Sequence, residues 1–352
     1  KLPQVHETDL TIEREIAHNT VLSVSYLGSF GRHLPDFVDI NTGAALTNIT
    51  YTVAAGGPLP AGSYTTQLFA VTSTVTKTST GAPVSSTTTS RPNGNFGAMS
   101  DIFSVINSNY NALAIQLNRR MTNHLQLSGS YTWSHSLDFG QNASTFSDTN
   151  DLLVPGNLGL EYGNSIFNVP DRFVFTAIAE SPWKVSGFLG YLANDWQLAP
   201  IYASQSGLPY SLVTAGTPPC LTLSTTTDPV TGNVTTVCAK ALGSGINGSN
   251  GRKGIDFVGR NTFQMKRTID MDLRLSKKVR FGEHYSAEVL GEAFNIFNHQ
   301  NVTGVNNTGY IIGGTATAPA LSYNSSFGSV TNTNSNFAYT SRQIQIGFRF
   351  FF

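Results

Sequence analysis

The strongest constraint in this sequence is a period-two alternation of apolar and polar residues in nine separate segments. In residues 267–277, RTIDMDLRLSK, every second position is apolar: Ile269, Met271, Leu273 and Leu275. A period of two is typical of a β-strand whose two faces meet different surroundings. The same pattern recurs in segments 8–16, 20–30, 109–119, 124–135, 171–180, 195–205, 284–296 and 342–352.

These segments have the length of strands that cross a membrane, since a tilted strand needs about 9–11 residues to do so. Charged residues make up only 12% of the chain, against a usual share of about 25%. No run of about 20 apolar residues offers a membrane helix. A transmembrane β-barrel agrees with both facts, because only every second residue of a strand contacts lipid. The alternative is a soluble sandwich, which would need long exposed loops with few charges.

Short and long connections alternate between the predicted strands. Four hairpins are closed by short turns at 17–19, 120–123 and 279–283 and by a longer one between 180 and 195. Long polar segments separate the hairpins at 31–108, 136–170, 206–266 and 297–341. Outer-membrane barrels alternate short periplasmic turns with long extracellular loops in this way. We predict an all-β fold, an antiparallel up-and-down barrel wall of about nine strands that is incomplete and ends at the periplasmic rim.

The charged residues indicate which face of the wall is which. A Lys or Arg on the lipid side costs roughly 2–4 kcal/mol at the bilayer midplane, so the charged row is expected to face the lumen. The lumen-facing polar residues predicted in this way are Asp270, Asp272, Arg274, Glu288 and Glu292. Charge pairs across strands, or contacts to a plug, are the first expectation for them, and guidance of a substrate is the alternative.

The last strand carries the first resemblance to a known system. The chain ends in RQIQIGFRFFF, with Phe348, Phe350 and Phe352 on one side. This end resembles the signal by which the barrel-assembly machinery recognises bacterial outer-membrane barrels. Stretches such as FNVPDRFVFTAIAESPW (167–183), WQLAPIYASQSGLPYS (196–211) and EVLGEAFNIFNHQN (288–301) are similar, in this order, to the C-terminal barrel of Oar-like TonB-dependent transporters.

That resemblance implies a barrel of about 22 strands around an N-terminal plug, which TonB and the proton-motive force displace to admit substrate. The plug, the TonB box and about 13 strands have no counterpart here, and bacterial single-chain barrels have even strand numbers. We expect residues 1–352 to be the C-terminal portion of such a receptor barrel, without plug domain and N-terminal strands. The implied location is the bacterial outer membrane. The implied partners are membrane lipid, the barrel-assembly machinery, TonB through the missing N-terminal region, and a small-molecule or oligomeric nutrient.

Cys220 and Cys238 are the two cysteines of the chain, and both lie in the long segment 206–266. A turn-like DPVTGN lies midway between them and has Thr- and Val-rich arms, so a small hairpin would bring the two sulfur atoms together. A disulfide is expected in an oxidising cell-surface setting. Two thiolates alone would make an incomplete metal site.

Three histidines follow ascending strands and are expected at the extracellular rim: His33, His135 and His299. A transporter could coordinate iron or haem there, but the simpler interpretation is three separate rim residues. We find no hydrolase, metalloprotease, nucleotide- or dinucleotide-binding motif, and therefore expect no enzyme and no cofactor. The net charge of zero gives no reason to expect nucleic acid.

Three functions are compatible with this pattern. The first is an active transporter whose long loops recruit a nutrient. The second is a smaller passive porin or channel, for which YTTQLFAVTSTVT (64–76) is the best candidate for an additional strand. The third is a surface adhesin that uses the barrel as an anchor. Saccharide fragments, siderophores and peptides all stay open as substrates.

Overall fold

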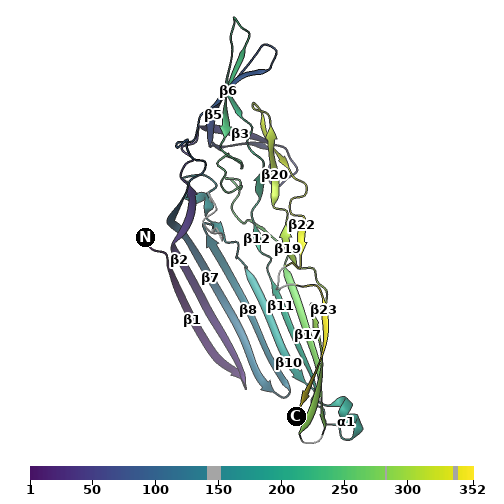
Figure 1. Cartoon of the computed structure of the whole chain (residues 1–352). Helices are drawn as coiled ribbons and strands as arrows, with labels where there is room; N and C mark the ends of the chain where they lie inside the picture. The colour runs from purple at the N-terminus through teal and green to yellow at the C-terminus, as the bar shows by residue number, and fades with distance from the viewer. Residues whose placement is uncertain (141–151, 282–283, 336–339) are drawn as a thin grey trace.

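Nine long strands form one antiparallel sheet in which each strand pairs with its neighbour along the wall (Figure 1). The computed structural model describes residues 1–140, 152–281, 284–335 and 340–352. In order, the strands are β1 (Gln4–Ala17), β2 (Thr20–Asp39), β7 (Ser100–Thr122), β8 (Leu125–Asp138), β10 (Asp171–Glu180), β11 (Trp196–Gln205), β17 (Thr268–Phe281), β18 (Tyr285–Phe294) and β23 (Gln343–Phe351). A tenth, β9 (Gly163–Asn164), pairs with the end of β8.

Every predicted strand is present in this wall, so the predicted all-β, antiparallel fold is confirmed. The structure differs at β2 and β7, which run for 20 and 23 residues. Their pairing continues past an irregularity between Gly31 and Leu34 up to the pair Asp39–Ser100. Residues 31–39 and 100–108 are therefore strand, although the sequence pattern places them in a long loop.

The two ends of the wall differ as predicted. At the short-turn end, β7 and β8 are joined by Asn123 and His124, whose φ angles of 50° and 64° are typical of a two-residue type I′ turn. The turn after β17 includes residues 282–283, which lie outside the described residues. The longer turn after β10 contains the helix α1 (Phe188–Ala193). The C-terminus also lies at this end (Figure 1).

The apolar rows of the nine strands align into one continuous face. Cross-strand pairs join Ile12 to Val24, Val24 to Ile115 and Ile115 to Tyr131. At the other edge of the sheet Gly291 pairs with Ile346 on the same face, and Ile346 is 82% exposed. Side chains so exposed are not packed against a second sheet or a helix layer. This one-layer geometry suits a wall with hydrocarbon on its outside.

The long connections are folded, and the buried core of the protein lies in them. We use the name cap for the described residues of the four long connections, which lie within 40–99, 139–170, 206–267 and 295–342. Its larger sheet joins β13 (Val213–Ala215), β20 (Thr308–Gly314), β21 (Pro319–Tyr323), β3 (Thr47–Val53) and β4 (Gly62–Leu68). A second sheet joins β14 (Leu221–Thr227), β15 (Val234–Ala241), β5 (Ala70–Lys77) and β6 (Pro83–Thr88).

Smaller elements complete the cap. Two-stranded pairs are β12 (Pro209–Tyr210) with β16 (Phe263–Gln264) and β19 (Val302–Val305) with β22 (Val330–Thr333). A single 3-10 turn, η1, covers Leu158–Glu161. The main core cluster contains buried side chains from three of the four connections, among them Ile49, Tyr51, Leu212, Ile255 and Tyr310. The long segments are thus a packed layer at one end of the wall (Figure 1).

Candidate ligand-binding site in the cap

The polar residues predicted to face the lumen lie together on the face opposite the apolar row. Arg274 pairs with Glu292 across β17 and β18, and their charged groups are 2.8 Å apart. Glu288 lies 3.6 Å from Arg349 of β23. Pairs of this cross-strand kind are the first expectation from the sequence. In them the two glutamates of β18 are balanced by one arginine of β17 and one of β23.

The two aspartates of β17 continue the same row. Asp270 and Asp272 pair with Ala203 and Ile201 of β11. An oxygen of Asp272 accepts a hydrogen bond from the backbone N–H of Asn295, at 2.9 Å. Asp272 therefore binds the first backbone N–H after the end of β18, so it has a structural role at the boundary between wall and cap.

The terminal phenylalanines lie on the outer, apolar face of the last strand. Phe350 pairs with Ala287 and stacks on Tyr285 and Phe352, with ring centroids 6.1 and 6.3 Å apart. Phe348 is 66% exposed. Among the described residues β23 pairs only with β18, so its other edge is open. The aromatic row of β23 therefore lies on the outer face beside an open edge, and its role as an assembly signal stays a prediction.

The three histidines lie near the cap but on different elements. His33 is in β2, His135 is in β8 and contacts Asn164 at 3.0 Å, and His299 follows β18. Across the part of the chain that the structure describes, no group of three or more His, Cys, Asp or Glu side chains is placed to hold a metal ion.

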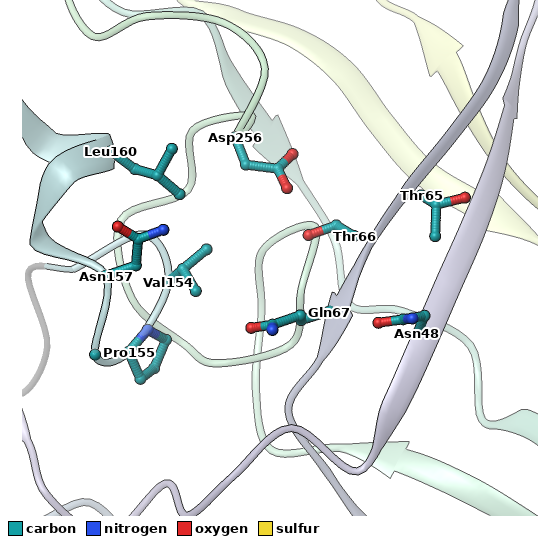
Figure 2. A pocket seen from close by; sticks show the side chains of 10 residues that line it. Asn48, Thr65, Thr66, Gln67, Val154, Pro155, Asn157, Leu160 and Asp256 are labelled. Carbon is teal, nitrogen blue, oxygen red and sulfur yellow. The ribbon is translucent and has the colours of Figure 1, made fainter.

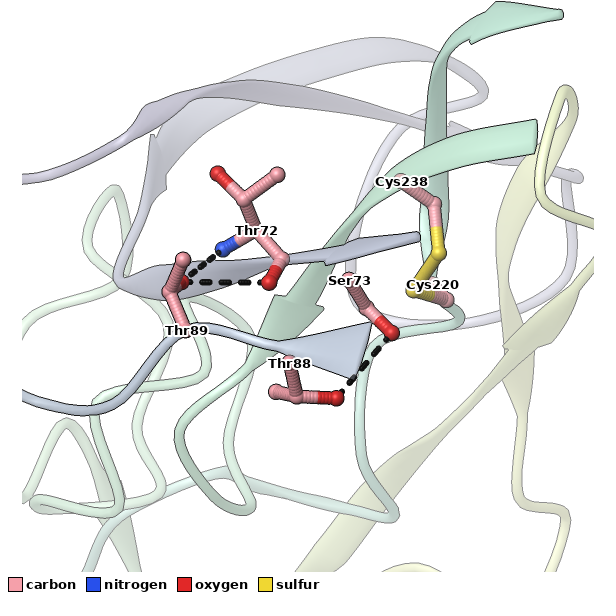
Figure 3. The surroundings of a disulfide bond; sticks show 6 residues. All are labelled: Thr72, Ser73, Thr88, Thr89, Cys220 and Cys238. Atoms are coloured by element: carbon pink, nitrogen blue, oxygen red, sulfur yellow. Dashed lines mark hydrogen bonds between the residues drawn. A yellow bond between two sulfur atoms is a disulfide. The ribbon is translucent and has the colours of Figure 1, made fainter. Parts of the chain in front are cut away.

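Cys220 and Cys238 form a disulfide at the base of the hairpin β14–β15, with Cα atoms 5.4 Å apart (Figure 3). The turn at the hairpin tip is held by Asp228, whose carboxylate accepts the N–H of Val230 at 2.8 Å. That hydrogen bond is the main reason that the pKa of Asp228 lies below its ordinary value. Beside the disulfide, β5 and β6 are joined by a hydrogen bond between Ser73 and Thr88 (Figure 3).

Buried ion pairs fasten the cap to the wall and the connections to each other. Asp138, at the end of β8, binds Arg260 from the third connection, and both side chains are buried. Glu161 of η1 binds Arg252 through a 2.6 Å contact and accepts the N–H of Leu153 at 2.6 Å. None of these pairs follows from a sequence motif, because the partners are about a hundred residues apart.

The cap contains a polar cavity of about 490 Å³ that no sequence motif indicates (Figure 2). Three segments build it: the hairpin β3–β4, the loop before η1, and the residue Asp256. Half of the ten lining residues carry uncharged hydrogen-bonding side chains. The lining consists of Asn48, Thr65, Thr66, Gln67, Val154, Pro155, Gly156, Asn157, Leu160 and Asp256.

Asp256 carries the single formal charge of this lining. Its Oδ1 is buried and has no hydrogen-bond partner among the described residues. A buried oxygen without a donor is costly, so the site favours a ligand that supplies an O–H or N–H group. Val154, Pro155 and Leu160, with Asn157 among them, lie across the cavity from Thr65 and Asn48 of the hairpin β3–β4 (Figure 2). The arrangement suits an uncharged ligand rich in hydroxyl or amide groups.

A family model described as "Outer membrane beta barrel domain" matches residues 1–345. Comparisons with curated proteins and with solved structures find no significant match. No helix within the described residues has the length and apolar character needed to cross a membrane.

Proposed function

This chain belongs to the outer membrane β-barrel domain family and lies in the bacterial outer membrane. On this basis we propose that it forms the wall and the substrate-recruiting cap of a TonB-dependent active transporter. The observation that carries the proposal is a folded cap, with a polar cavity, at the end of a one-layer wall. A structure of this kind presents a binding site at the cell surface and an inner face along which a ligand can pass.

The two edges of the wall support a larger barrel around these nine strands. β1 is exposed over all of its 14 residues, and within the described residues it pairs only with β2. Unpaired backbone groups are not tolerated in lipid, so the edges of β1 and β23 need further strands as partners. A wall of about 22 strands, wide enough for a plug, would provide them.

The passive porin is a weaker alternative because its additional strand is absent from the wall. The segment 64–76 is divided between β4 and β5, which belong to two different sheets of the cap. Conductance of the full protein in planar bilayers separates the two functions: a large, steady conductance without any energy source would favour the porin. The surface adhesin is tested by deletion of the gene. If the deletion abolished adhesion but left uptake intact, the adhesin would be favoured.

Uptake by whole cells tests the transport proposal directly. We expect uptake of an uncharged oligosaccharide or peptide by cells that carry the full protein, and its loss when a protonophore removes the proton-motive force. Asp256→Ala should weaken apparent affinity by about 10- to 100-fold, since a hydrogen bond to a charged group contributes roughly 1.5–3 kcal/mol. Asp101→Ala, at an exposed carboxylate of β7, is the matched control. Uptake that continues without the proton-motive force would refute active transport.

A further inference from the structure

The cavity around Asp256 lies along the open edge of a cap sheet. β4 is the last strand of the five-stranded sheet, and within the described residues its one neighbouring strand is β3. Three consecutive residues of β4 line the cavity: Thr65, Thr66 and Gln67. Consecutive side chains of a strand point to opposite faces of its sheet, so a cavity that touches all three lies at the strand's edge. The backbone of β4 therefore borders the cavity.

This edge presents backbone groups that a ligand can bind. An edge strand leaves a row of N–H and C=O groups without a strand partner on its outer side. In the described part of the chain, the backbone of residues 65–67 pairs with residues 48–50 of β3 and with no other segment. A ligand that carries donors and acceptors at the spacing of a strand can satisfy the groups on the outer side.

The rest of the lining favours a peptide over a saccharide. Among the described residues that line the cavity there is no Phe, Tyr or Trp on which a sugar ring could stack. Val154, Pro155 and Leu160 instead provide apolar surface across from the hairpin β3–β4, which suits an aliphatic side chain better than a ring covered with hydroxyl groups (Figure 2). Asp256 adds one negative charge and a buried oxygen without a donor, which suits the free ammonium group at the start of a peptide.

We propose that the cap cavity binds a short extended peptide, which adds to the edge of β4 as a further strand. Main-chain hydrogen bonds hold the peptide along residues 65–67, and Asp256 accepts a hydrogen bond from its terminal ammonium group. Strand addition to an exposed sheet edge is a recurring mode of peptide recognition. A peptide with uncharged side chains and free ends has no net charge. The inference rests on the proposed function, of which it names the substrate class.

A binding selection tests the substrate class. Strand residues lie about 3.4 Å apart, so a tetrapeptide places its three amides along residues 65–67. The full protein in lipid nanodiscs is mixed with two equimolar pools: tetrapeptides of uncharged residues, and neutral tetrasaccharides of glucose, xylose and mannose. We expect mass spectrometry of the retained compounds to find tetrapeptides. Retention of tetrasaccharides alone, or of neither pool, would overturn the inference.

Methylation of the peptide's amides tests strand addition without any change to the protein. In an added strand, successive amides point alternately toward β4 and away from it. For the tetrapeptide that binds most tightly, methylation of an amide that faces β4 should weaken binding about 10-fold in calorimetry, because it removes one hydrogen bond. Methylation of the next amide along the peptide should weaken binding less than about twofold. Equal effects at all three amides would contradict strand addition.

The charged end of the peptide has a control of its own. Acetylation of the peptide's amino group should weaken binding about 10- to 100-fold in the unchanged protein, and much less in Asp256→Asn. In Asp101→Asn, at an exposed carboxylate of β7, acetylation should cost as much as in the unchanged protein. The same cost in Asp256→Asn would refute the role of Asp256. Binding needs no proton-motive force, so these results can fail while active transport stands, and uptake without that force would leave them intact.

Discussion

The ion pair between Arg252 and Glu161 offers a sharp test of how the cap is held together. Arg252 comes from the third long connection and Glu161 from the second, and their charged atoms are 2.6 Å apart. The Glu161 side chain is only 1% exposed, and its other oxygen accepts the N–H of Leu153. Arg252→Met keeps most of the side-chain volume but leaves a buried carboxylate with one backbone donor.

Removing one partner of a buried ion pair usually costs about 3–5 kcal/mol, because the remaining charge stays in a poorly solvated place. The Arg252 side chain is 17% exposed, so water can reach part of the site and the lower end of that range applies. If the free energy of opening this part of the cap falls by about 3 kcal/mol, the equilibrium constant for local opening rises roughly 150-fold. The side-chain contacts of this pair, with each other and with Leu153 and Leu160, all lie within the cap, so the wall strands should keep their stability.

Hydrogen exchange of the full protein in lipid nanodiscs measures this local opening. Amides around Leu153 and η1 should exchange about 100-fold faster in Arg252→Met, while amides of the wall stay protected. The control is Arg267→Met, which breaks a 2.6 Å pair with Asp171 whose arginine is 46% exposed and should cost under about 1 kcal/mol. Adding Glu161→Gln to Arg252→Met should recover part of the loss. Equal effects of the two arginine variants would refute the reasoning.

Three further changes address the wall, the disulfide and the core. Ile346→Arg puts a charge on the lipid side and should cost roughly 2–4 kcal/mol, visible as less folded protein in the membrane, whereas Gln345→Arg points inward and should assemble normally. Replacing Cys220 and Cys238 by alanine should destabilise the hairpin by about 3 kcal/mol, seen as faster cleavage there by protease. Burial raises the pKa of the Tyr51 phenol, so the contribution of Tyr51 to the stability of the cap should be fully present below pH 10.0, the ordinary tyrosine pKa, and be lost progressively above it. Tyr51→Phe should flatten this alkaline loss, which near-ultraviolet circular dichroism measures.

The wall is predictable because its pattern is local. In residues 267–277 the environment of each side chain alternates between lipid and lumen, and the sheet has a single layer, so the period of two survives along the whole strand. The charged row then distinguishes the inner face without knowledge of the neighbours. Even the disulfide follows locally, since its two cysteines flank one hairpin only 18 residues apart.

The cap is not predictable in the same way, because its partners are distant. β21 pairs in parallel with β3 through Ala320 and Thr52, which come from the last and the first long connections. β15 pairs antiparallel with β5 through Cys238 and Ser73, which come from the third and the first long connections. These strands are short, and even where one alternates, as β3 does with buried Ile49, Tyr51 and Val53, the sequence does not show which distant strand it pairs with. The cavity is hidden for the same reason, since it joins residues from three connections.

The position of the core explains why the connections are so long and so poor in charge. A wall solvated by lipid on its outside needs no second layer, so the chain has no apolar core between its nine strands. The cap is in water and must bury apolar surface to be stable, and none of its connections holds enough to do so alone. The wall brings the ends of all four connections to one rim, which lowers the entropic cost of joining them. Ile49, Leu212 and Tyr310 can then pack into one cluster. The cap's fold, and with it the cavity around Asp256, therefore depends on the strand order of the wall beneath it.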